Sequence, residues 1–166
     1  MQPKIPAYVM TLLSLVLPWL VFAKGATIRI VIRGATLTTP IEISDASIVH
    51  RFNVWSGPGI GPSRDLEGMN IDCWRGIAHP PPGTLESYIV SFVTERSNPS
   101  TYVVRYEIDP VTKQGYVYIP GKHDPAYRDN VWLIYRGIEG NWFYASKAWQ
   151  ALADPLIFKT LRTGSK

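Results

Sequence analysis

The sequence predicts a single α+β domain, made mainly of antiparallel β-sheet, with a long Gly/Pro-rich loop and a C-terminal helix packed on the sheet. Three observations support this prediction. Apolar and polar residues alternate in several short runs joined by tight turns, a pattern that favours antiparallel over parallel pairing. Glycine and proline concentrate between residues 53 and 84. Apolar residues recur at helical spacing near the C-terminus.

Two strands and a short helix are expected at the start of the domain. Residues 27–33 (TIRIVIR) alternate strictly, which predicts a half-buried strand whose buried face carries Ile28, Ile30 and Ile32. The run over 37–43 (LTTPIEI) is expected to pair back on this strand, at a sheet edge or with a bulge, because Pro40 lacks an amide donor. A helix over 45–52, capped by Ser44, is expected to follow.

The loop predicted over residues 53–84 is long for a compact domain. Eleven of its 32 residues are Gly or Pro, and loops of this length are usually functional or mobile. A short strand is expected inside it at residues 69–74 (MNIDCW).

Strand patterns return between residues 86 and 120. Alternation over 88–93, 102–108 and 116–119 predicts three strands. The segment 109–115 between the last two combines an aspartate, a proline and a glycine, which suits a hairpin turn.

The C-terminal part is expected to end in helix. Residues 124–136 fit either a helix that begins after Asp124 or a strand over 130–135 (NVWLIY), and the sequence leaves both open. Residues 144–152 have apolar residues at helical spacing, and Asp154 with Pro155 is expected to cap a second turn of helix.

Residues 1–23 are predicted to be a secretory signal peptide. The apolar run over 7–23 carries no charge, follows Lys4 and ends at Ala23, which suits cleavage before Lys24. Because this run is slightly shorter than the roughly 20 residues that span a bilayer, a cleaved signal is favoured over an uncleaved membrane anchor. The mature chain, residues 24–166, is therefore expected in the periplasm or outside the cell.

The charge and the motifs exclude several classes of function. The chain has seventeen Lys and Arg and thirteen Asp and Glu. Because the basic residues are spread among acidic ones along the sequence, nucleic acid is not an expected partner. The three histidines and the single cysteine lack zinc-binding spacing, and no phosphate loop or nucleophile elbow is present, so no metal or cofactor is predicted. The lone Cys73 is interpreted as a small buried apolar residue.

The densest set of candidate site residues lies at 135–143 (YRGIEGNWF). Glu139 stands between two glycines beside Trp142, with Arg136 available to orient it, which suits a carboxylate next to an aromatic platform at a glycan site. The favoured structural interpretation makes the glycines a turn, Asn141 the cap of the final helix, and Trp142 with Phe143 part of the core.

Two further sets of residues are candidates. His123 beside Asp124 fits an imidazole oriented by a carboxylate for general-base catalysis, although an exposed turn with Asp124 as a helix cap explains the same residues. Tyr116 and Tyr118 share one strand face and suit a stacking surface, although aromatic pairs also pack antiparallel sheets. Trp55 in the long loop is a further binding candidate.

Three segments, 52–59 (FNVWSGPG), 114–121 (QGYVYIPG) and 134–143 (IYRGIEGNWF), resemble those of exported bacterial proteins that have no assigned activity. The resemblance covers most of the mature chain and implies a bacterial envelope setting. It implies no activity, cofactor or catalytic residue.

Because no catalytic motif is found, the expected function is that of an exported, non-enzymatic binding or envelope-associated domain, with a glycan or an envelope protein as partner. One alternative is a small hydrolase or lyase that acts on glycan or peptide through Glu139 or His123, with the loop over 53–84 as a lid. The other is a structural protein that self-associates through Cys73 or a sheet edge.

Overall fold

The computed structural model describes residues 26–34, 37–52, 70–80, 83–95, 101–130 and 138–163. Within these ranges, six strands form one sheet in the order β2-β1-β3-β4-β5-β6, and every neighbouring pair is antiparallel. The strands are β1 (Thr27–Gly34), β2 (Ile41–Ile43), β3 (Glu86–Thr94), β4 (Thr101–Ile108), β5 (Gly115–Tyr118) and β6 (Trp142–Tyr144). The helical segments are α2 (Ala46–Arg51), the 3₁₀ turn η3 (Cys73–Arg75), α3 (Tyr127–Asn130) and α4 (Lys147–Thr163).

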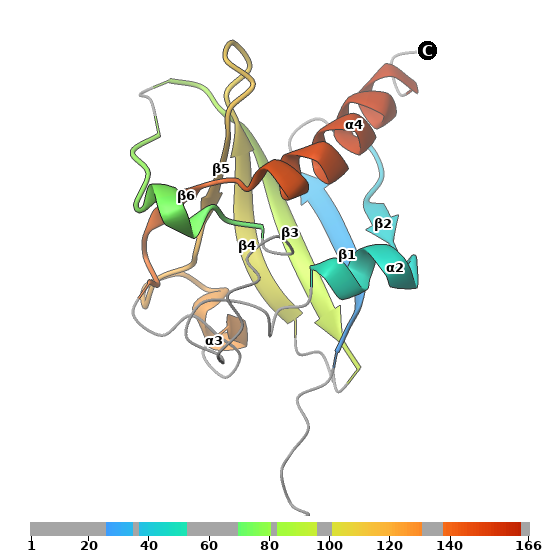
Figure 1. The fold of residues 1–166 in the computed structure, drawn as a ribbon, viewed down its shortest axis with the longest axis horizontal. Coiled ribbons are helices and arrows are strands. Elements are labelled where there is room, and N and C mark those ends of the chain that lie inside the picture. The colour runs from blue at the N-terminus through green and yellow to red at the C-terminus, as the bar shows by residue number, and fades with distance from the viewer. Residues whose placement is uncertain are drawn as a thin grey trace, which may run out of the picture.

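The helices α2 and α4 cover one face of the sheet, which we call the inner face; the opposite face is the outer face. Figure 1 shows α4 crossing in front of the sheet, with α2 beside it. The expected α+β fold, with an antiparallel sheet and a C-terminal helix packed on it, is confirmed. The Gly/Pro-rich loop falls largely outside the described residues, so it stays a prediction.

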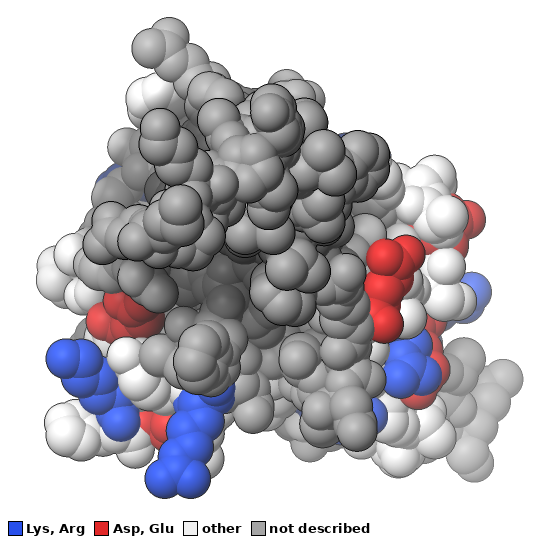
Figure 2. Space-filling view, turned by 90° about the horizontal axis from the view of Figure 1, so that it is seen from below, with Lys and Arg blue, Asp and Glu red and all other residues white. Residues whose placement is uncertain are grey.

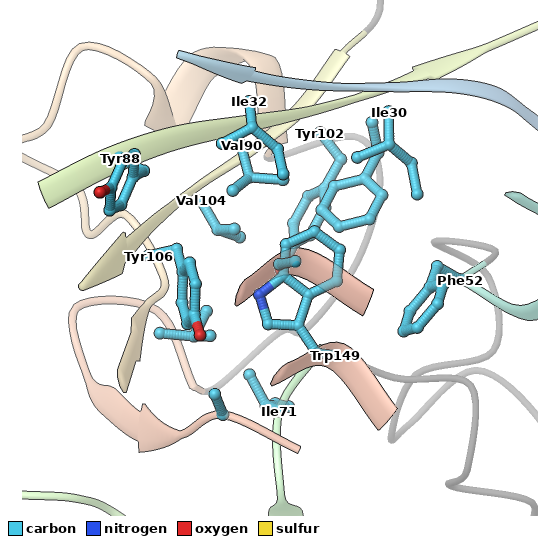
Figure 3. Packing of buried hydrophobic residues seen from close by; sticks show 14 of the residues in the cluster. Ile30, Ile32, Phe52, Ile71, Tyr88, Val90, Tyr102, Val104, Tyr106 and Trp149 are labelled. Atoms are coloured by element: carbon cyan, nitrogen blue, oxygen red, sulfur yellow. The ribbon is translucent and has the colours of Figure 1, made fainter. Parts of the chain in front are cut away.

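The core lies between the inner face and the two helices. Trp149 of α4 is fully buried and contacts Phe52 at the end of α2, Phe92 of β3 and Tyr106 of β4, with ring centroids 5.4 to 5.9 Å apart (Figure 3). The Tyr106 hydroxyl donates a hydrogen bond of 2.6 Å to Oδ1 of Asp154 on α4. Aromatic packing and this bond together hold α4 on the sheet.

Strand β1 departs from the predicted alternation at its start. The register with β3 shifts between Thr27 and Arg29, as at a β-bulge, and leaves Ile28 46% exposed. The prediction that Ile28 shares the buried face was therefore wrong, because an extra residue reverses the facing of the side chains before it. Ile30 and Ile32 are buried, as expected.

The second strand and the first helix follow the predicted order. Strand β2 lies at one edge of the sheet, as Pro40 indicated. Helix α2 is capped by Asp45 and not by Ser44, because the Asp45 carboxylate accepts hydrogen bonds from the backbone N–H groups of Ser47 and Ile48.

The three strands expected between residues 86 and 120 are β3, β4 and β5. In the hairpin between β4 and β5, the Asp109 carboxylate accepts from the backbone N–H groups of Val111 and Thr112. Lys113 adopts a φ of 60°, so a non-glycine residue takes the left-handed position in this turn. The predicted hairpin is confirmed.

No regular strand forms over residues 70–74 of the segment that the sequence predicted as a strand at 69–74. Ile71 and Ile77 make isolated antiparallel bridges to Ala145 and Phe143, and η3 interrupts the pairing between them. The Asp72 side chain caps η3 by accepting from the N–H groups of Trp74 and Arg75. This local bonding competes with strand pairing and limits it to single bridges.

The C-terminal elements differ from the prediction in two ways. Tyr144 belongs to β6, and a single helix runs from Lys147 to Thr163 through Pro155. Proline removes one hydrogen bond, to the carbonyl of Ala151, and because Ala151 is exposed, water can satisfy that group. Of the ambiguous stretch over 124–136, residues 124–126 form a turn, Tyr127–Asn130 is the helix α3, and residues 131–136 lie outside the described residues.

Candidate functional site

Four aromatic side chains of β5 and β6 gather on the outer face of the sheet. They form two cross-strand pairs, Tyr118 with Trp142 at a centroid distance of 5.0 Å and Tyr116 with Tyr144 at 5.6 Å. Because side chains alternate along a strand, the intervening Val117 and Phe143 point to the inner face and belong to the core. We call Tyr116, Tyr118, Trp142 and Tyr144 the aromatic platform.

An arginine lies over the pair formed by Tyr118 and Trp142. The guanidinium carbon of Arg105 on β4 is 4.8 Å from each of the two ring centroids. Its Nε atom is 3.1 Å from Oε1 of Glu107, which makes an ion pair without the alignment of a hydrogen bond. This contact does not engage the two Nη nitrogens, and the Arg105 side chain remains 39% exposed.

Polar contacts hold the rings of the aromatic platform in place. The Tyr118 hydroxyl donates to Oδ2 of Asp124 at 2.9 Å, and burial together with this bond raises the pKa of Tyr118. The guanidinium of Arg75 lies 3.4 Å from the ring centroid of Tyr144 and donates to Oε1 of Gln114. Rings fixed in this way lose little conformational entropy when a ligand binds.

The aromatic platform continues into a row that runs across the sheet from β6 to β1. Five residues on adjacent strands pair directly with one another, so their side chains form a line on the outer face. We call this line the transverse row, and its members are Arg33, Ile89, Arg105, Tyr118 and Trp142. Ile89 is 43% exposed and Arg33 is exposed, so the row is open to solvent on β1 and β3. Next to it, Val31 and Ser91 of the outer face are buried.

Charges of both signs are interspersed on the surface. In the view from below, Figure 2 shows basic and acidic side chains close together at the lower left and on the right of the molecule. Two ion pairs occur in the described ranges, Arg29 with Glu42 at 3.4 Å and Arg105 with Glu107. Arg33 has no ion pair within those ranges.

The two turns that carry the catalytic candidates Glu139 and His123 lie against each other. A Cβ atom built on Gly121 would be 2.8 Å from the Cα atom of Gly140, so the two backbones approach too closely for any side chain there. The Gly140 N–H donates to the carbonyl of Ile119 at 2.8 Å. Sequence spacing gave no sign of this proximity.

These turns are held by bonds that do not form a catalytic pair. The Asp124 carboxylate accepts from the Gly121 N–H at 2.8 Å and from the Tyr118 hydroxyl, and no hydrogen bond joins it to His123 among the described residues. His123 is exposed. Asp124 therefore supports the turn and the platform, whereas the sequence suggested that it orients His123 or caps a helix with its side chain.

Asn141 and Trp142 differ from their favoured structural interpretation. The Asn141 amide donates to the carbonyls of Ile138 and Glu139, and the strand β6 follows it, so Asn141 does not cap the final helix. Ser146 caps α4 by accepting from the N–H of Trp149 at 3.1 Å. Phe143 is buried in the core, while Trp142 lies on the outer face.

The structure brings together only some of the sequence candidates. Tyr116, Tyr118 and Trp142 meet in the aromatic platform, whereas Arg136 and Trp55 lie outside the described residues. Burial and the nearby Asp72 raise the pKa of the Cys73 thiol to about 11, so Cys73 is a poor nucleophile. In the described part of the chain, no group of His, Cys, Asp and Glu side chains is arranged to hold a metal ion.

Sequence reasoning missed one member of the aromatic platform, Tyr144. It also missed the charged residues around the platform, which are Arg75, Arg105 and Glu107. Tyr144 was assigned to a helix, although its two-residue spacing from Trp142 matches that of Tyr116 and Tyr118. Two pairs of aromatic residues, each pair spaced by two residues as on one face of a strand, were the signal in the sequence that could have revealed the platform. The arginines came from other segments, and only the pairing of strands reveals them.

Comparison with known proteins gives no further guide to the site. No protein-family model matches this chain, and no curated protein or solved structure is significantly similar to it. Among the described residues, no helix is both long enough and apolar enough to cross a membrane.

Proposed function

We propose that this protein is an exported, non-enzymatic binding domain that holds a glycan on the outer face of its sheet. The observation that carries this proposal is the aromatic platform, in which the tilted rings of Tyr118 and Trp142 lie 5.0 Å apart next to the guanidinium of Arg105. Export and an envelope location are part of the proposal and rest on residues 1–23 alone.

The chemistry of the platform suits a sugar ring. A pyranose presents C–H bonds on its faces and hydroxyl groups around its rim. The half-buried rings of Tyr118, Trp142 and Tyr144 provide an apolar surface for the C–H bonds. The guanidinium of Arg105 beside them provides hydrogen-bond donors for hydroxyl groups. A pre-organised sheet face of this kind suits a chain of sugars that lies across it.

The proposal is tested by affinity electrophoresis of the purified protein in native gels that contain soluble polysaccharides. The set includes neutral hydroxyethyl cellulose and glycol chitin and acidic polygalacturonate and alginate. We expect retardation by at least one polymer, and loss of that retardation in the Trp142→Ala variant. The matched control is Trp74→Ala, because Trp74 is 82% exposed and lies outside the platform.

Circular dichroism must show that both variants are folded. If no polymer in the set retards the protein, or if Trp74→Ala weakens binding as much as Trp142→Ala, the platform is not a glycan-binding surface. A folded Trp142→Ala variant that binds as well as the unchanged protein leads to the same conclusion.

A second candidate function is favoured by the contact between the turns of residues 119–124 and 138–141. Glu139 and His123 belong to these adjoining turns, and a carboxylate and an imidazole are side chains that a small hydrolase or lyase uses as acid and base. The Glu139→Gln variant keeps the shape and removes the charge. If the protein cleaves a bound polysaccharide and this variant does so at the same rate, Glu139 is not the acid or base.

A further inference from the structure

We propose that the ligand of the outer face is an acidic polysaccharide that carries uronic-acid carboxylates, and that Arg33 and Arg105 bind those carboxylates. This inference rests on the proposed function and goes beyond it, because it names the charge of the ligand and the residues that recognise it.

The positions of the two arginines support this assignment. Arg33 pairs with Ile89, and Ile89 pairs with Arg105, so the two arginines are separated by two strand spacings on one face. Neighbouring strands lie about 4.8 Å apart, which puts their Cα atoms roughly 10 Å apart. Two arginine side chains that start from this backbone spacing suit carboxylates that recur along an extended chain.

The state of each arginine also fits an anionic ligand. Arg33 is exposed and makes no ion pair within the described ranges, so its charge is available. Arg105 is oriented by the two rings and by Glu107, and that ion pair leaves its Nη nitrogens for a carboxylate. Glu107 is largely buried and lies in the neighbouring row, where its charge is paired with Arg105.

The rest of the transverse row explains why the anion belongs to a sugar. Ile89 between the two arginines is 43% exposed, and Tyr118 and Trp142 continue the row beyond Arg105. Apolar and aromatic surface therefore alternates with positive charge along one line. An acidic peptide offers carboxylates, but it lacks the rigid sugar rings that would lie on this apolar and aromatic surface.

The test compares acidic and neutral polymers on the full-length protein. We expect polygalacturonate to bind more tightly than neutral galactan, and binding to weaken as salt is added, because exposed charges are screened. Arg33→Gln should weaken polygalacturonate binding roughly fivefold, as expected for one exposed charge contact.

The matched control is Arg29→Gln, on the same strand and face and with the same change in charge. Arg29 is paired with Glu42, and it lies four residues from Arg33, about 13 Å along the strand. We expect this variant to bind polygalacturonate like the unchanged protein. Equal losses in both variants would show a general charge effect and overturn the assignment of Arg33.

The outcomes separate this inference from the proposed function. If galactan binds as tightly as polygalacturonate and binding depends on Trp142, the platform binds glycans and the acidic preference is wrong. If polyglutamate binds as tightly as polygalacturonate, the ligand is defined by charge alone and the glycan assignment fails. If neither polysaccharide binds, both the inference and the proposed function fail.

Discussion

Replacing Asn130 by alanine should destabilise the protein by removing two hydrogen bonds that continue the sheet. Asn130 is 98% buried, since only 2% of its surface is exposed. Its Oδ1 accepts from the Val103 N–H at 2.7 Å, and its Nδ2 donates to the Val103 carbonyl at 2.6 Å. The pairing of β4 with β5 covers Arg105–Ile108, so Asn130 takes the place of a partner strand at Val103.

The magnitude follows from these two bonds. Each contributes about 1 kcal/mol net, and backbone groups left without a partner cost a further 1 to 3 kcal/mol when they cannot reach water. Val103 is half-buried, so part of that cost is relieved by solvent. We therefore expect Asn130→Ala to lower the free energy of unfolding by about 2 to 4 kcal/mol.

A charged variant tests the direction of the bonds. In Asn130→Asp the side chain still accepts from the Val103 N–H, but an ionised carboxylate repels the Val103 carbonyl oxygen that the amide contacted at 2.6 Å. A protonated acid can donate to that carbonyl. The difference in stability between this variant and the unchanged protein should therefore shrink as the pH falls from about 7 to 4.

The assay is urea denaturation followed by tryptophan fluorescence, with the unchanged protein measured at each pH. Asn141→Ala is the control, because Asn141 also donates to two carbonyls but through longer bonds of 3.2 and 3.3 Å in a part-buried turn. The reasoning is refuted if Asn130→Ala costs less than about 0.5 kcal/mol, the range of ordinary surface substitutions, or no more than Asn141→Ala.

Three further changes are expected to have defined effects in the same denaturation assay. Gly115→Ala should cost about 1 to 3 kcal/mol, because its Cβ would lie 2.7 Å from the Tyr106 hydroxyl in a closed core. Ser146→Ala should cost about 1 kcal/mol through loss of the α4 cap. Burial raises the pKa of Asp154 above its ordinary value of 3.8, so the folded protein favours the protonated carboxyl. This stabilisation is complete below the ordinary pKa and is lost as the pH rises through the pKa of the folded protein. Asp154→Asn should therefore gain stability relative to the unchanged protein between about pH 4 and 7.

Each of these expectations has a contrary result. An unchanged midpoint for Gly115→Ala would mean that the hairpin and Tyr106 move apart without strain. A stable Ser146→Ala variant would mean that another group caps α4. A pH-independent difference for Asp154→Asn would mean that this carboxyl titrates alike in the folded and unfolded chains.

The sequence was most informative where one segment decides its own conformation. Alternation over 88–93 and 102–108 predicted β3 and β4, and the turn at Asp109 predicted the hairpin that follows. The prediction was wrong where pairing with an adjacent strand sets the conformation. The bulge at Ile28 arises in the pairing of β1 with β3, and Tyr144 belongs to β6 because it pairs with β5. Helix α4 continues through Pro155 because packing of Trp149, Ala153 and Ile157 outweighs one missing hydrogen bond.

The sequence by itself determined that this chain forms antiparallel strands, places β2 at an edge and ends in a helix, since period, proline and turn residues act locally. Only the tertiary structure decided that β1 lies between β2 and β3 and that Arg33, Arg105, Tyr118 and Trp142 share one row. Strand order and register depend on contacts between segments far apart in the chain. A shift of one residue turns every side chain to the other face, so no single segment encodes the site.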